Sequence, residues 1–155
     1  MTSDIEDFLS LLLPQGRLLG LDVGEVTIGL ALSDAGRMIA TPLHTIERKK
    51  FTTDMQSLQE TIAKHAVGGL VIGYPVNMDG SLGPRTQSTR TFASNLKKHI
   101  ALPILLWDER MTTMAVERMM IEADMSRKRR AELVDKLAAS YILQGVLDRL
   151  RSLNP

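Results

Sequence analysis

The hydrophobic positions of this chain change their spacing along the sequence, and each change marks a boundary between predicted elements. Two short apolar runs at 17–22 and 27–33 are separated by the turn at 23–26, and a third run covers 38–46. Apolar runs of this length with turns between them are typical of an antiparallel meander of three strands. Pro42 predicts an edge or a bulge in the third strand, because proline cannot donate a ladder hydrogen bond.

Beyond the third strand, the spacing becomes that of helices alternating with buried strands. Phe51, Met55, Leu58 and Ile62 recur at helical intervals, and Gly68 and Gly69 are expected to end that helix. Two later runs are apolar throughout, which is typical of parallel strands covered by helices on both faces. The remaining elements are predicted as strands over 69–73 and 103–107 and helices over 85–100, from Thr112 or Thr113, and over 130–150.

This order of elements predicts an α/β domain over residues 17–152. Its sheet is expected to be mixed and five-stranded, with a three-strand antiparallel meander plus two β-α strands, flanked by helices. Residues 1–16 form an N-terminal extension with a short amphipathic helix over 5–13, which either packs on the domain or is mobile. Ligands of such sheets bind outside the carboxyl ends of the strands.

Composition narrows the class of protein. The 155 residues are 44% hydrophobic, which is enough for one core, and the absence of cysteine excludes disulfides and thiolate chemistry. The net charge of +1 means that any nucleic-acid surface must come from local clusters of cations. No apolar run approaches the roughly 20 residues of a membrane span, so we expect a cytoplasmic protein without membrane contact.

Acidic residues follow two of the predicted strands and recur on the last helix. Asp22 ends the first strand, Asp108 and Glu109 end the fifth, and Asp135 shares a helix face with Ala138, Ala139 and Ile142. Taken singly, each acid has an ordinary explanation as a turn residue or an ion-pair partner. Together they predict a divalent-cation site, because clustered carboxylates repel one another unless cations lie between them. Two such ions can activate water and stabilise the leaving oxygen of a phosphodiester.

Four segments in order resemble the motifs of the YqgF (RuvX) family, and together they span residues 18–150. The segments are LDVGEVTIGLALSD (21–34), GYPVNMDGSLGP (73–84), DERMTT (108–113) and DKLAASYILQ (135–144). The resemblance implies a ribonuclease H-like fold and a nuclease that uses two Mg²⁺ or Mn²⁺ ions. It implies Asp22, Glu109 and Asp135 as catalytic acids and metal ligands, with Asp108 as a further ligand. One departure is Thr27, where the family usually has a basic residue.

Candidate substrate contacts lie in the loop after residue 73 and in the basic clusters. Gly80 permits close approach of the backbone to phosphate, and Asn77 and Ser81 can hydrogen-bond ribose or backbone. A purely structural loop and a solvated charged face are the competing interpretations of these two features. The candidate contacts are Asn77, Gly80, Ser81, Arg85, Arg110, Arg127, Lys128, Arg129 and Arg130.

The resemblance leaves several functions open. The favoured one is processing of the 5′ end of pre-16S ribosomal RNA, with structured RNA and ribosomal precursor particles as partners of a monomer or homodimer. The second is a Holliday junction resolvase acting on branched DNA in recombination and repair. The third is a non-catalytic ribosome-assembly or transcription factor. An actin-like ATPase, suggested by Asp22 and Gly24, needs two such domains, and this chain is too short for them.

Overall fold

The computed structural model describes residues 1–77, 79–110, 123 and 126–153, and within that part the side chains of 130–136 are not described. Its five strands form one sheet in the order β3-β2-β1-β4-β5. β1 pairs antiparallel with β2 and β2 with β3, whereas β1–β4 and β4–β5 are parallel. The predicted meander plus two β-α strands is therefore confirmed. The strands are β1 (Arg17–Val23), β2 (Thr27–Ser33), β3 (Ala40–Glu47), β4 (Val67–Tyr74) and β5 (Ile104–Asp108).

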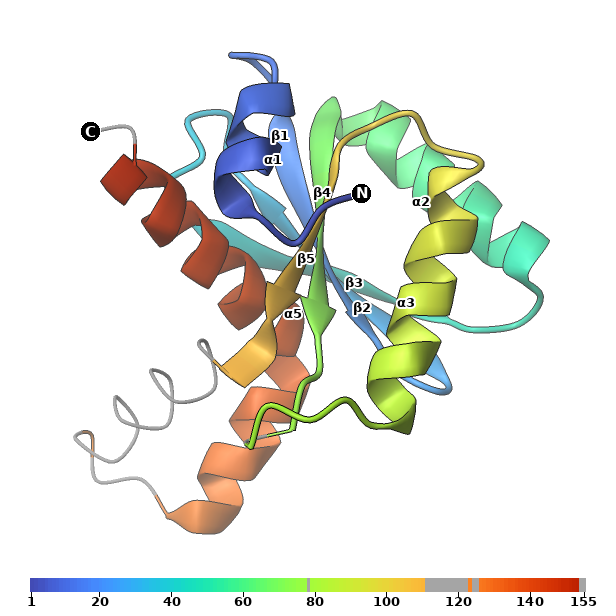
Figure 1. The fold of residues 1–155 in the computed structure, drawn as a ribbon. Helices are drawn as coiled ribbons and strands as arrows, with labels where there is room; N and C mark the ends of the chain where they lie inside the picture. Colours follow the sequence, from blue (N-terminus) through green and yellow to red (C-terminus); the bar gives the residue numbers. More distant parts are fainter. Residues whose placement is uncertain (78, 111–122, 124–125, 154–155) are drawn as a thin grey trace.

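Helices cover both faces of the sheet (Figure 1). α2 (Phe51–His65) and α3 (Pro84–Lys97) pack on one face, where Leu58 and Leu96 join the larger hydrophobic core. α5 (Arg127–Leu153) and α1 (Ile5–Leu11) pack on the other. The helix expected from Thr112 or Thr113 lies outside the described residues. Among the helices that the structure describes, none is long and apolar enough to cross a membrane.

The third strand is an edge strand with an irregular register, as Pro42 predicts. β3 pairs only with β2 within the described sheet, and the register shifts between Gly29 and Ala31 of β2. Pro42 lies opposite Ala31, beside this shift. A proline is tolerated there because an edge strand needs only half of its backbone hydrogen bonds.

The N-terminal extension packs against the domain. Phe8 of α1 is completely buried in the core beneath α5. The backbone of Thr2 donates to Ile104 O at 2.9 Å and accepts from Leu106 N at 2.8 Å, which adds a short parallel bridge beside β5. The guanidinium of Arg37 donates to the carbonyls of Leu13 and Gly16. The bridge at Thr2 covers part of the outer edge of β5, and the other contacts hold the extension against the rest of the domain.

The expectation that Gly68 and Gly69 end the preceding helix was wrong. α2 ends at His65, and Ala66 takes a left-handed conformation with φ of 53° that turns the chain into β4. Both glycines therefore belong to β4. A Cβ at Gly69 would lie 2.7 Å from Leu12 Cδ2 and 3.2 Å from Phe8 Cζ, so the glycine makes room for the N-terminal extension.

The final helix begins earlier than the predicted residue 130. α5 starts at Arg127, and the Ser126 hydroxyl accepts the Arg129 N–H at 3.2 Å, as a capping residue does. The basic run therefore occupies the first turn of α5. The helix dipole opposes cations at a helix N-terminus at a cost of about 0.3–1 kcal/mol each. These basic residues are therefore not expected to stabilise the fold.

Candidate active site

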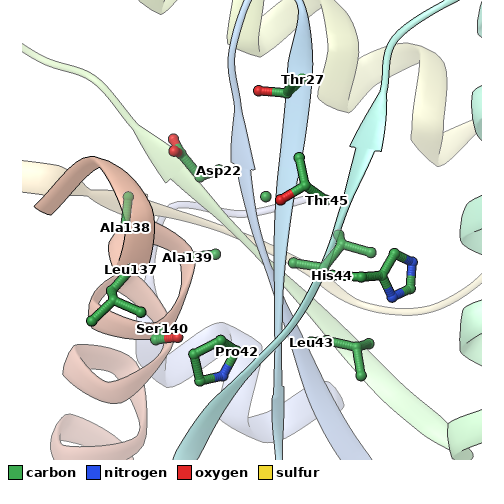
Figure 2. Close-up of a pocket in the computed structure, with 12 residues that line it drawn as sticks. Asp22, Thr27, Pro42, Leu43, His44, Thr45, Leu137, Ala138, Ala139 and Ser140 are labelled. Atoms are coloured by element: carbon green, nitrogen blue, oxygen red, sulfur yellow. The ribbon is translucent and has the colours of Figure 1, made fainter. Parts of the chain in front are cut away.

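Asp22 lies near the carboxyl end of β1 on the face that α5 covers. It pairs across the sheet with Gly29, and a Cβ at Gly29 would lie 3.8 Å from both Asp22 Cβ and Ala139 Cβ. In Figure 2, Asp22 and Thr45 face the space beside Ala138 and Ala139 of α5. This space is a hollow of about 140 Å³ between α5, β2 and β3.

Glu109 follows β5 directly and extends over β4 toward α5. A Cβ at Gly73 would lie 2.5 Å from Glu109 Oε1 and 2.5 Å from Ile142 Cδ1 of α5. The missing side chain at Gly73 therefore makes the space that the carboxylate occupies. β4 lies between β1 and β5, so Asp22 and Glu109 reach the same end of the sheet from either side of β4.

Glu109 and Asp22 are close enough to interact electrostatically. Burial of the Glu109 carboxyl, and then the negative charge of Asp22, raise its pKa from 4.5 to about 7. The positive charge of Arg85 opposes this shift, and Asp108 adds to it. A half-buried carboxylate next to another carboxylate is unfavourable when both are ionised. The arrangement therefore fits a divalent cation, which would relieve the repulsion and lower the cost of burial.

Asp108 is engaged differently from Glu109. Its carboxylate accepts from Nη2 of Arg110 at 2.7 Å and from Nε at 3.0 and 3.1 Å. These bonds to Arg110 hold the pKa of Asp108 below its ordinary value, although burial opposes the shift. The pair keeps Arg110 beside Glu109, in a hollow of about 410 Å³ that both residues line. The role of Asp108 as a metal ligand stays a prediction.

Asp135, the third expected acid, is a residue of α5, and its side chain lies outside the described part. It precedes Ala139 by about one helical turn, and Ala139 lies beside Asp22. Within the described residues, no three acids or histidines come together as a metal site. The grouping of Asp135 with the other two acids remains a prediction.

The loop after β4 is held by its own side chains. Asn77 Nδ2 donates to Ser81 Oγ at 3.0 Å, and the Ser81 hydroxyl donates to Asp79 at 2.6 Å. Gly80 has φ of 90°, a conformation that favours glycine, and lies beside the Arg110 guanidinium. Asn77 and Ser81 are exposed but already hydrogen-bonded within the loop. Their contact with substrate stays a prediction.

The predicted cations fall into two groups around the acids. Arg85, in the first turn of α3, and Arg110 line the hollow that contains Glu109. Arg127, Lys128 and Arg129 are exposed at the start of α5, while the side chain of Arg130 is not described. Figure 1 shows the starts of α3 and α5 at the same end of the sheet as the carboxyl ends of β4 and β5. Both groups therefore lie toward the end of the sheet at which β4 and β5 end.

Thr27 and Gly73 border the two candidate acids, Asp22 and Glu109. Thr27 begins β2, pairs with Glu47 and lines the hollow beside Asp22 (Figure 2). The sequence predicts Gly73 as the end of a strand and the start of the second motif, and the structure shows that it also makes the space for Glu109. No signal in the neighbouring sequence marks that role, because the contact joins two strands far apart in the chain.

Replacing Gly73 by alanine is expected to lower the cleavage rate about 100-fold, because the new Cβ displaces the Glu109 carboxylate. The same Cβ would also clash with Ile142 Cδ1, so Gly73→Ala should lower the melting temperature as well. The double variant Gly73→Ala/Ile142→Val removes that second clash and should recover the melting temperature but not the activity. Steady-state cleavage kinetics and melting curves measure both effects. Gly36→Ala in the β2–β3 turn is the matched control, and normal activity of Gly73→Ala would contradict the assigned contact.

The fold defines the class of protein: an α/β domain with a ribonuclease H-like fold, in which Asp22 and Glu109 lie at the ends of β1 and β5. Solved structures of RuvC from T. thermophilus share the fold. One, described as being in complex with Holliday junction substrate, has a TM-score of 0.56 at 11% identity and covers 87% of this chain and 96% of that chain. A second has a TM-score of 0.54 over the same shares.

Sequence comparison identifies the family. The model described as "RuvX: Holliday junction resolvase" matches residues 16–149, and the chain belongs to this family. A relative from Rhodobacter capsulatus, named "Putative pre-16S rRNA nuclease", is 59% identical over 149 residues, covering 96% of this chain and 94% of the relative. A relative of the same name from Paramagnetospirillum magneticum is 62% identical over 132 residues, covering 85% of each chain. The resemblance found in the four motifs is confirmed.

Proposed function

We propose that this protein is a metal-dependent nuclease that hydrolyses a phosphodiester bond at the 5′ end of pre-16S ribosomal RNA. The observation that carries the proposal is the pair of carboxylates, Asp22 and Glu109, which lie on either side of β4 and interact electrostatically, with the pKa of Glu109 raised to about 7. The names of the relatives support the RNA substrate. The nuclease domain is residues 17–152, with residues 1–16 packed on it as an extension.

In this proposal, Asp22, Glu109 and Asp135 hold two Mg²⁺ or Mn²⁺ ions. The ions would supply charge that stabilises the attacking and leaving oxygens of the phosphodiester. Gly73 lets the Glu109 carboxylate lie over β4, next to Ile142 of α5. Arg85 and Arg110 would hold the substrate phosphate beside Glu109, since both line its hollow. The start of α5 would contribute longer-range attraction through Arg127, Lys128, Arg129 and Arg130.

The proposal is tested by incubating the purified protein with a precursor 16S RNA and with a synthetic four-way DNA junction. We expect cleavage near the 5′ end of the mature RNA with Mg²⁺ or Mn²⁺, and none with a chelator. The Asp22→Asn chain should cut neither substrate. Intact RNA together with a cleaved junction would reject the RNA assignment and support the second candidate.

That second candidate, resolution of branched DNA, is favoured by one observation. The chain shares its fold with a RuvC structure in complex with a Holliday junction, and the family model carries the description of a junction resolvase. Symmetric cleavage of a four-way junction calls for a symmetric dimer, so a strictly monomeric protein in solution would count against it. A chain without activity on either substrate that still supported ribosome assembly would instead favour the non-catalytic alternative.

A further inference from the structure

A second basic hollow lies between the β1–β2 turn, the end of β3 and the start of α3. Its volume is about 450 Å³, and three cations from separate segments line it, namely Arg48, Lys49 and Arg85. Glu25 is the one carboxylate among its lining residues. We call this space the Arg48 cleft. Net positive charge in a concave surface attracts anions more strongly than the same charges spread over a flat face.

Arg48 is held in a defined orientation within the cleft. Its Nη1 donates to the carbonyl of Gly24 at 2.6 Å, two residues beyond Asp22. Its guanidinium also stacks over the ring of Phe92 in α3, 5.4 Å from the ring centroid. A guanidinium that is already ordered loses less conformational entropy when an anion binds. Arg48 therefore links the turn after Asp22 to Phe92 of α3.

A buried carboxylate in α2 holds the backbone of Lys49 in place. Asp54, in the first turn of α2, is only 4% exposed, and its Oδ1 accepts the backbone N–H of Lys49 at 3.1 Å. That bond fixes the backbone between β3 and α2. The side chain of Lys49 itself is exposed. Its charge can therefore meet a ligand in the cleft without disturbing the core.

Arg85 connects this cleft with the acids. It lines the Arg48 cleft and also the hollow that holds Glu109 and Arg110. Gly83, which precedes α3, has no side chain to cap the helix, so α3 adds its positive N-terminal end to the same region. The two hollows thus meet at Arg85 and form a positively charged track that leads from Glu109 past α3 to Lys49.

We propose that the Arg48 cleft is a phosphate-binding subsite, which holds a backbone phosphate of the substrate RNA away from the bond that is cut. This inference rests on the proposed function, because the track begins at the proposed catalytic acids. In this proposal, one end of the bound RNA lies on the side of the sheet that α3 covers, and not at the basic start of α5. The cleft binds phosphate by charge and would act on any base sequence.

The first test measures RNA binding by the Asp22→Asn chain, which leaves the RNA uncut. A fluorescently labelled single-stranded RNA from the 5′ processing region is titrated at several salt concentrations. Adding Lys49→Gln should weaken binding about 3- to 10-fold and reduce the slope of log K against log salt by about 0.7, the value for one phosphate contact on a single strand. Lys98→Gln, at the exposed far end of α3, is the matched control and should change neither value.

The second test locates the phosphate. A set of RNAs is prepared, each with one neutral methylphosphonate at a different position. At one position, the modification should weaken binding to the chain that keeps Lys49. The same modification should have no effect in the Lys49→Gln chain, since the contact is already lost. Glu25→Gln should act in the opposite direction and tighten binding. Arg48 is left unchanged, because its bond to Gly24 also orders the turn after Asp22.

The outcomes separate the two proposals. If the wild-type chain cuts the RNA but Lys49→Gln binds with unchanged affinity and salt slope, the subsite is rejected and the nuclease assignment stands. If the chain neither binds nor cuts RNA while it does cut the junction, the RNA function fails and the subsite for RNA fails with it. A position-specific loss that depends on Lys49 supports the subsite whatever the rate of cleavage.

Discussion

Asp22→Asn is expected to reduce the cleavage rate by about 1,000-fold or more while the fold stays intact. Asp22 lies at the end of β1 and lines the hollow beside α5. Its negative charge interacts with the carboxyl of Glu109. An amide has the same shape as the carboxylate but cannot hold a divalent cation by charge. Losing about 4 kcal/mol of transition-state stabilisation corresponds to this rate. Single-turnover cleavage at saturating enzyme measures the loss in the chemical step.

Two controls separate a catalytic effect from a structural one. Asp7→Asn removes an exposed carboxylate from the first turn of α1, away from the hollows beside Asp22 and Glu109, and should cleave at the normal rate. The melting temperature of Asp22→Asn in a chelator should stay close to that of the wild type, because the amide keeps the shape of the side chain. Cleavage by Asp22→Asn at more than one-tenth of the normal rate would refute the assignment of Asp22.

Glu109→Gln should abolish cleavage and at the same time stabilise the metal-free protein. The pKa of the Glu109 carboxyl is about 7 in the folded chain and 4.5 as the unperturbed value, so the folded state binds the extra proton between these values. The free energy of unfolding therefore falls as pH rises through this range. Glutamine cannot ionise, so the variant should gain about 2 kcal/mol at pH 8, after allowance for solvent screening.

The pH and cation dependence make this expectation specific. Denaturant melts in a chelator should show no gain for Glu109→Gln near pH 4.5, where the wild-type carboxyl is already largely protonated. The gain should grow up to about pH 7 and then level off. Adding Mg²⁺ should stabilise the wild type more than the variant, because only the carboxylate holds the cation by charge. A Glu109→Gln chain that is less stable than wild type at pH 8 in chelator would contradict the raised pKa.

The strand pattern was predictable because each strand carries its own local signal. The three-strand meander and the two apolar strands β4 and β5 follow from periodicity and turns, and Pro42 marks the edge strand. Helix ends were less predictable. Gly68 and Gly69 resemble a helix stop, but Gly69 packs against Phe8 and Leu12, and Gly68 packs against the backbone at Gly16. A glycine has the same local sequence signal in either role, and only the contact across the fold separates the two.

The candidate acids were predictable as residues, although not as a geometry. Asp22 and Glu109 end their strands, so the topology of a parallel pair of strands brings them to one edge. Asp108 stands next to Glu109 in sequence and is bonded to Arg110 instead of joining Asp22. Asp108 is the last residue of β5 and Glu109 lies just beyond it, so adjacent acids at the end of a strand need not have the same partners.

The sequence alone therefore determined the order of the strands along the chain and the family, and it supplied the candidate acids, because periodicity and motifs are local properties of a chain. The tertiary structure decided the contacts between distant residues. It put Glu109 over Gly73, raised the pKa of its carboxyl next to Asp22, and joined Arg48, Lys49 and Arg85 in one cleft. Burial and electrostatic interaction depend on distances through space, and those distances are established only when the sheet and its helices pack together.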